Sequence, residues 1–141
     1  MEAADKIIES GVSSKRVYIM EVMGKYCGYL ALLGSIASGA DRVYLHENGI
    51  SMQDLQCDID RLKSRFSEQE NSSKKKQHHF TRTTTTTSAF FVRNEASSDV
   101  FTTDFICSLF ESEGKSIFEV RKSLLGHLQQ GGRPTGEKKK K

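Results

Sequence analysis

Residues 21–39 constrain the fold of this 141-residue chain more than any other stretch of its sequence. Before them, residues 16–22 form a β-branched and aromatic run whose nearly continuous apolar character is typical of a parallel strand buried on both faces. A glycine turn follows, and small residues then recur from Gly28 to Ser38, which suits a helix packed closely on a sheet. We therefore predict a strand, a turn and a tightly packed helix.

The turn at Met23 and Gly24 has two interpretations. Gly24 and Gly28 give the backbone unusual freedom, the following helix start has unbonded N–H groups, and Lys25 adds a positive charge. Together these features predict a phosphate site. Short glycine patterns also occur in ordinary strand-to-helix turns, and spacing alone leaves both interpretations open.

Apolar periodicity predicts further elements along the chain. Ser51 is suited to cap one helix, and Thr102 or Thr103 to cap another. The predicted helices cover residues 1–11, 52–66 and 102–113, and the predicted strands cover residues 41–45, 89–92 and 117–125. Because strands alternate with helices, we predict an α/β fold of parallel strands joined by right-handed crossovers.

Composition narrows the classes of protein that the chain can belong to. The net charge of +3 comes largely from lysine runs at 74–76 and 138–141, so overall charge gives no support for nucleic-acid binding. Three widely spaced cysteines without a Cys-x-x-Cys pair predict reduced thiols. No membrane span or signal peptide is expected, which favours a cytoplasmic location.

The predicted organisation has four parts. Residues 1–67 form an α/β segment that carries the Met-Gly-Lys turn, and residues 68–88 form a low-complexity linker or insert. Residues 89–135 form a second segment, and residues 136–141 a lysine-rich tail. His78 and His79 lack acidic or thiol neighbours, so we interpret them as solvent-exposed side chains rather than metal ligands.

Five motifs occur in a fixed order: EVMGKYCGYLAL at 21–32, SGAD at 38–41, VRNE at 92–95, TTDF at 102–105 and LGHLQQGG at 125–132. They resemble the ATP-dependent 6-phosphofructokinases, whose sugar-phosphate sites carry Met-Gly-Arg followed by a Cys-Gly-Tyr-Leu-Ala run. The resemblance covers most of residues 16–135 apart from 68–88. It implies a partial Rossmann-like phosphofructokinase fold with parallel strands and flanking helices.

The resemblance also implies a sugar-phosphate or effector site. Its residues would be Arg16, Met23, Gly24, Lys25, Glu95, Arg121, His127, Leu128, Gln129 and Gln130. Cationic members suit phosphate, whereas the carboxylate and amides suit hydroxyl groups. Single residues also have structural interpretations: Arg16 as a surface charge, Glu95 as a local partner of Arg93, and His127 as a buried histidine.

Eukaryotic members of the family resemble a duplicated bacterial subunit, with a catalytic half and a carboxyl-terminal half that binds fructose 2,6-bisphosphate. Catalytic halves typically read His-x-Gln-Arg-Gly-Gly, and Gln130 stands at the position of that arginine. The chain also lacks the Gly-Gly-Asp-Gly-Ser motif of nucleotide binding, and apart from Thr102-Thr103-Asp104 of the TTDF motif it has no Thr-x-Asp segment that could carry the family's catalytic aspartate. We therefore interpret it as part of the effector half, with no catalytic residue and no cofactor or metal site of its own.

The resemblance assigns ATP and magnesium to the whole enzyme. The expected partners are a sugar phosphate or bisphosphate, the remainder of a phosphofructokinase chain, and further subunits in a homo- or hetero-oligomer. Two alternatives remain at this point. One is a divergent catalytic half that binds fructose 6-phosphate, and the other is a non-enzymatic module that binds anions or nucleic acid through the lysine runs.

Overall fold

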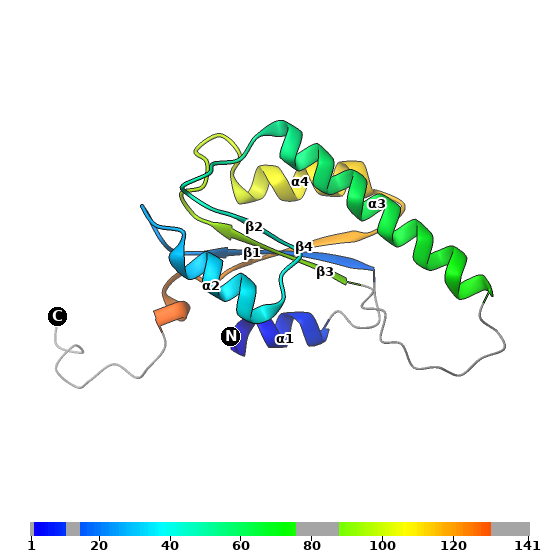
Figure 1. Ribbon diagram of the computed structural model, residues 1–141, viewed down its shortest axis with the longest axis horizontal. Coiled ribbons are helices and arrows are strands. Elements are labelled where there is room, and N and C mark those ends of the chain that lie inside the picture. Colours follow the sequence, from blue (N-terminus) through cyan, green and yellow to red (C-terminus); the bar gives the residue numbers. More distant parts are fainter. Residues whose placement is uncertain (1, 11–14, 76–87, 131–141) are drawn as a thin grey trace.

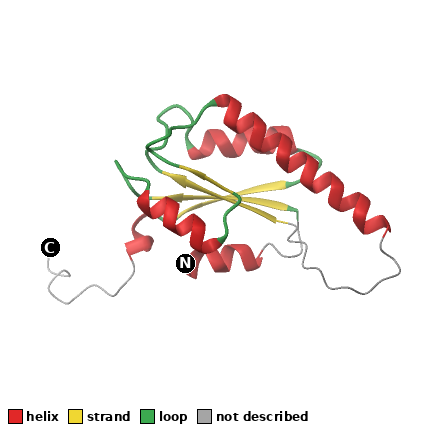
Figure 2. Cartoon of the chain, viewed as in Figure 1, coloured by secondary structure: helices red, strands yellow, loops and turns green. Residues whose placement is uncertain are grey.

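A computed structural model describes residues 2–10, 15–75 and 88–130 of the chain. Four strands form one parallel sheet in the order β2-β3-β1-β4, with helices on both faces (Figures 1 and 2). The α/β fold with parallel strands and flanking helices is thus confirmed. In chain order the elements are α1 (Glu2–Ser10), β1 (Arg16–Val22), α2 (Tyr29–Ser38), β2 (Arg42–Tyr44), α3 (Met52–Lys75), β3 (Ser88–Asn94), α4 (Thr103–Gly114), β4 (Glu119–Leu124) and the 3-10 helix η1 (Gly126–Gln130).

Strand β1 is one of the two inner strands of the sheet. It pairs in parallel with β3, where Arg16 faces Ser88, and with β4, where Arg16 faces Glu119. Both of its faces are buried, because Val17 and Ile19 join one apolar cluster while Tyr18 and Met20 join the other. The continuous apolar run in the sequence is therefore explained by helices on both sides of this strand.

Two hydrophobic cores lie on opposite faces of the sheet. Helices α3 and α4 cover one face, where Leu55, Ile59 and Phe66 of α3 meet Ile106 and Phe110 of α4. Helices α1 and α2 lie on the other face, as Figure 1 shows. The smaller second cluster consists of Ala4, Tyr18, Met20, Val22, Ala31, Phe90 and Val92.

Helix α2 buries part of its run of small residues. Ala31 and Ser35 are buried, which confirms close packing at these two positions. Gly34 is different, because a Cβ atom built there would have no neighbour within 4 Å. The helix ends at Gly39, whose positive φ of 68° lets its N–H group reach the carbonyl of Ile36.

The ends of two other helices differ in how well the sequence predicts them. The Thr102 hydroxyl accepts a hydrogen bond from the N–H of Phe105, so Thr102 caps α4 as expected. Helix α3 runs on to Lys75, past the predicted end at residue 66, so the first part of the 68–88 stretch is helical. Once a helix is nucleated, each added residue gains a hydrogen bond, so the helix can extend past its last apolar residue. The part at 76–87 lies outside the described residues.

Over residues 2–10, 15–75 and 88–130, none of the helices combines the length and the apolar character that crossing a membrane requires.

Candidate functional site

Four connections meet at one edge of the sheet. Because all the strands are parallel, their carboxyl ends point the same way, and open α/β sheets place ligand groups at this edge. Residues 23–28, which we call the glycine turn, follow β1. The loop after β3, the loop after β2 and the helix η1 after β4 bring their side chains to this turn.

Two predicted site residues contact the backbone of the glycine turn. The N–H group of Met23 donates to Gln129 Oε1 at 2.7 Å, and Gln129 Nε2 donates back to the Met23 carbonyl at 3.3 Å. The N–H group of Gly24 donates to Glu95 Oε1 at 3.0 Å. The structure thus brings together Met23, Gly24, Glu95 and Gln129, although they come from three separate parts of the sequence.

Glycine is required at position 24. Its φ of 154° lies in a region that residues with side chains rarely adopt. A Cβ atom there would stand 2.6 Å from Asn94 Nδ2 and 2.6 Å from the Cys27 carbonyl oxygen. The turn is therefore closed tightly around Gly24, which explains the glycine without reference to a ligand.

The first N–H group of helix α2 also has a partner. Gly28 offers no side chain to cap the helix, and the N–H group of Gly28 donates instead to Glu47 Oε1 at 2.8 Å. This hydrogen bond lowers the pKa of the exposed Glu47 carboxyl group below its ordinary value. The neighbouring His46 Nδ1 lies 2.8 Å from the Ala96 carbonyl oxygen, so the loop after β2 contacts both the turn and the loop after β3.

Acidification should remove the stability that Glu47 contributes. Its pKa is lower in the folded chain, so the contribution is present above the pKa of the unfolded chain and disappears as the pH falls through the folded value. At about pH 7 the wild type should therefore unfold at a higher temperature than Glu47→Gln, because a carboxylate favours a helix N-terminus. At about pH 2 the two unfolding temperatures should be closer together than at about pH 7, because the Glu47 carboxyl group becomes protonated as the pH falls through its lowered pKa. Thermal unfolding at both pH values measures this.

The matched control for Glu47 is Glu111→Gln, since Glu111 is an exposed side chain on α4. It should unfold like the wild type at neutral pH. A difference between Glu47→Gln and the wild type that stays constant between the two pH values would contradict the assignment of Glu47 as the cap of α2.

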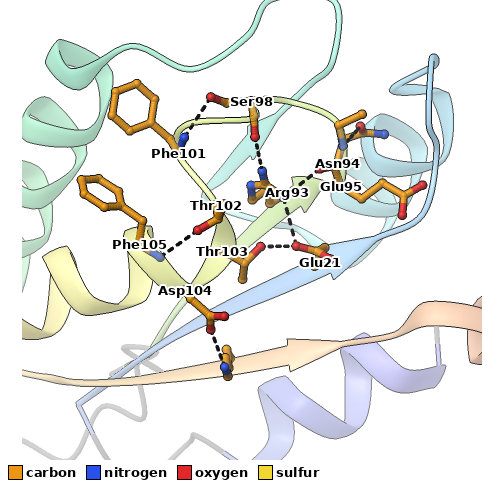
Figure 3. Close-up of polar contacts among 12 residues, drawn as sticks. Glu21, Arg93, Asn94, Glu95, Ser98, Phe101, Thr102, Thr103, Asp104 and Phe105 are labelled. Atoms are coloured by element: carbon orange, nitrogen blue, oxygen red, sulfur yellow. Dashed lines mark hydrogen bonds and ion pairs between the residues drawn. The ribbon is translucent and has the colours of Figure 1, made fainter.

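A buried ion pair supports the loop after β3 (Figure 3). Arg93 leaves only 3% of its side chain exposed and pairs with Glu21 of β1 at 3.0 Å. The same guanidinium group donates to the carbonyls of Glu95 at 3.1 Å and Ser98 at 2.8 Å. Glu21 also accepts a hydrogen bond from the Thr103 hydroxyl at the start of α4.

Burial has the largest effect on the pKa of the Arg93 guanidinium group. It lowers the pKa of Arg93, and the adjacent Glu21 carboxylate opposes this change. Because Arg93 pairs with Glu21, the expected alternative of a local pair between Arg93 and Glu95 is wrong. The Glu95 carboxylate bonds to the glycine turn instead.

The other predicted residues at this edge are more exposed. Lys25 Nζ lies 5.4 Å from the centroid of the Tyr26 ring. His127 is exposed on η1, so its interpretation as a buried histidine is wrong. Leu128 leaves 82% of its surface exposed, and the side chain of Gln130 lies outside the described residues. Among the described side chains of residues 127–129, Gln129 is the one that hydrogen-bonds to the turn.

Arg16 and Arg121 lie away from the glycine turn. Arg16 begins β1 and Arg121 faces Tyr18 in the register, so they stand roughly 15–25 Å along the strands from Met23, at about 3.3 Å per residue. Arg16 Nε and Arg121 Nη2 both contact Glu119 Oε2, at 3.4 and 3.3 Å. The predicted site residues therefore form two groups, one at the turn and one around Glu119.

No cluster of three or more His, Cys, Asp or Glu side chains that could hold a metal ion occurs within the described part of the chain. His78 and His79 lie outside it.

Sequence reasoning missed three residues that hold this edge together: Glu47, Arg93 and Asn94. Arg93 and Asn94 stand in the VRNE motif, but the motif does not say which groups their side chains reach. Asn94 is fully buried, and its Nδ2 donates to two carbonyls of the glycine turn. Nothing in the local sequence of Glu47 indicates that it bonds to Gly28, the N-cap residue of α2, which lies 19 residues earlier.

Comparison with known proteins gives matches along almost the whole chain. A family model described as Phosphofructokinase matches residues 1–138. An ATP-dependent 6-phosphofructokinase of Dictyostelium discoideum is 42% identical over 135 residues, covering 96% of this chain and 14% of the relative. The platelet-type enzyme of Homo sapiens is 39% identical, covering 95% of this chain and 15% of that protein.

A solved structure agrees with these sequence matches. The T-state structure of Pichia pastoris phosphofructokinase superimposes with a TM-score of 0.80 at 31% identity, covering 95% of this chain and 14% of the yeast chain. The chain therefore spans about one seventh of the length of each of these three proteins.

Proposed function

Because this chain belongs to the phosphofructokinase family, we propose that it binds a sugar bisphosphate at the glycine turn, with fructose 2,6-bisphosphate as the ligand. The observation that supports this most is the meeting of Glu95 and Gln129 at the backbone of Met23 and Gly24. These four residues come from motifs that lie far apart in the sequence, and they meet at the sheet edge where α/β proteins place ligands.

The chemistry of this group suits the sugar ring better than phosphate. The N–H groups of Met23 and Gly24 already bond to side-chain oxygens. The carboxylate of Glu95 and the amide of Gln129, in contrast, can exchange hydrogen bonds with hydroxyl groups. Cations for phosphate at this edge are Lys25 and, when protonated, His127. In the proposal the sugar hydroxyls face Glu95, and the phosphates extend toward these exposed groups.

Arg16 and Arg121 belong to the proposal in a different way. They lie farther from Met23 than a sugar bisphosphate can reach, as the strand register shows. They are available to a ligand held by another subunit or by another part of a longer chain. Association with such a partner, in the cytosol, is part of the proposed function.

The proposal includes no phosphoryl transfer by these residues. The sequence lacks the glycine-rich nucleotide motif, and its one Thr-x-Asp triplet, residues 102–104, belongs to the TTDF motif. Phosphoryl transfer depends on groups that position ATP and stabilise charge. In a whole enzyme that phosphorylates fructose 6-phosphate with ATP and magnesium, this segment supplies effector binding.

Removal of the Glu95 charge should weaken the bisphosphate complex. A hydrogen bond to a charged group contributes about 1.5–3 kcal/mol, so Glu95→Gln should raise the Kd for fructose 2,6-bisphosphate about tenfold or more. Calorimetric titration of the folded 141-residue chain measures the Kd, and Glu111→Gln is the matched control on an exposed helix face. Arg121→Ala should change the Kd only in an associated state.

Three outcomes of this titration bear on the proposal. Saturable binding of the bisphosphate that Glu95→Gln weakens supports it. Tighter binding of fructose 6-phosphate than of the bisphosphate would assign the site to a catalytic half instead. If the folded wild type bound neither sugar phosphate, the binding role would be removed.

A further inference from the structure

Asn94 is a polar side chain with no exposed surface at the carboxyl end of β3. It stands opposite Val22, the last residue of β1, so it lies beside the point where the glycine turn begins. A buried amide is costly unless its donors and acceptor find partners. The identity of those partners therefore shows what the residue does.

The partners of Asn94 lie in two loops. Its Nδ2 group donates to the Gly24 carbonyl at 2.8 Å and to the Cys27 carbonyl at 3.2 Å, which uses both of its hydrogens. Its Oδ1 atom accepts from the N–H group of Ala96 at 2.9 Å. One side chain thus ties the two ends of the glycine turn to the loop that carries Glu95.

Other side chains cannot replace this arrangement. Aspartate would place a second acceptor against the two carbonyl oxygens. Glutamine would add a methylene group on the side of Gly24, where the space is so small that a Cβ atom on Gly24 would lie 2.6 Å from Asn94 Nδ2. Serine would fit, but it could donate only one hydrogen bond. The contact is therefore specific to an amide of this length.

The opposite side of the same turn is the candidate site. Asn94 bonds to the carbonyl of Gly24, while the N–H group of Gly24 faces Glu95. We propose that Asn94 is a positioning residue, which holds the glycine turn so that Met23 and Gly24 meet Gln129 and Glu95. It then sets the affinity for the sugar bisphosphate without contacting the ligand, and this last part rests on the proposed function.

The test compares Asn94→Asp with Asn48→Asp, because Asn48 is an exposed asparagine in the loop after β2. Trypsin cleavage after the exposed Lys25 reports on the turn, and cleavage after the exposed Arg61 on α3 reports on global opening. In Asn94→Asp, the rate after Lys25 relative to Arg61 should rise about tenfold or more. The Kd of Asn94→Asp for fructose 2,6-bisphosphate should also rise about tenfold or more. Asn48→Asp should change the cleavage ratio and the Kd by less than about twofold each.

The pH dependence separates positioning from a general loss of structure. A carboxyl group in this buried place has a raised pKa, and once protonated it can donate one hydrogen bond to the turn. The Kd of Asn94→Asp relative to the wild type should therefore recover partly between about pH 7 and about pH 5. Asn94→Ser, which has no titrating group, should show no recovery. The groups that face Asn94 are the carbonyls of Gly24 and Cys27 and the N–H group of Ala96, and the nearby carboxylate of Glu95 is present in every variant.

Each outcome decides one part of the inference. If Lys25 and Arg61 are cut faster by the same factor, or the Kd does not change, Asn94 has no positioning role. If the wild type does not bind the bisphosphate, the proposed function fails, and the cleavage ratio alone still decides whether Asn94 holds the turn.

If neither Asn94 variant folds, the wild type supplies the answer through NMR. The side-chain amide hydrogens of Asn94 should exchange with solvent at least about tenfold more slowly than those of Asn48. The reason is that both amide hydrogens of Asn94 are hydrogen-bonded and its side chain is buried. Equal exchange rates would overturn the inference.

Discussion

Replacing Arg93 with methionine should lower the free energy of unfolding by about 3–5 kcal/mol, the usual result of removing one partner from a buried ion pair. The guanidinium group is 3% exposed and bonds to Glu21, and its loss also leaves the carbonyls of Glu95 and Ser98 without their donor. The loss of unfolding free energy should lie toward the lower end of this range, because the Glu21 side chain keeps 27% of its surface exposed and water can solvate its carboxylate. Urea denaturation followed by circular dichroism measures the change.

Two further variants test the cause of that loss. Arg61→Met removes an arginine whose side chain is 76% exposed, so it should cost less than about 1 kcal/mol. Adding Glu21→Leu to Arg93→Met should restore part of the stability, since no unpaired carboxylate then remains. Equal losses in Arg93→Met and Arg61→Met would show that the buried pair does not stabilise the fold.

Gly24→Ala should lower the free energy of unfolding by about 2–4 kcal/mol, because strain at φ 154° and a Cβ atom 2.6 Å from two polar atoms act together. Gly34→Ala is the matched control. Gly34 lies within α2 and a Cβ atom there meets nothing within 4 Å, so this change should stabilise the chain by about 0.5–1 kcal/mol. Thermal or urea unfolding of the two variants should give shifts of opposite sign. If Gly24→Ala left the stability unchanged or raised it, the backbone at position 24 would be less restricted than the structure shows.

Local sequence signals predicted the elements well where the signal and its cause lie close together. The apolar run 16–22 matches β1, and Thr102 caps α4, because each depends on a few consecutive residues. The end of α3 was missed by nine residues, since the predicted end followed Phe66, the last residue of the apolar pattern, whereas the helix continues to Lys75. Periodicity shows where a helix is covered rather than where it stops.

The site was predictable in part. The ordered motifs placed Glu95 and Gln129 together with Met23 and Gly24, and the structure joins these residues by hydrogen bonds. Arg16 and Arg121 lie several residues before the ends of their predicted strands, so their distance from the turn could have been predicted. The contact of Arg16 with Glu119 could not, because it depends on the register between β1 and β4. The contacts of Arg93, Asn94 and Glu47 are also tertiary, because each of these residues contacts a residue on a different loop or strand.

The position of β1 between β3 and β4 also determines when the chain can fold during its synthesis. Arg16 and its neighbour Glu119 are separated by 103 residues, so the ribosome needs roughly 5–20 s after making β1 before β4 begins to appear. During that interval one edge of an apolar central strand has no partner. A chaperone that binds extended apolar segments would find its target in residues 16–22, and slower translation would lengthen the time for which that target is exposed.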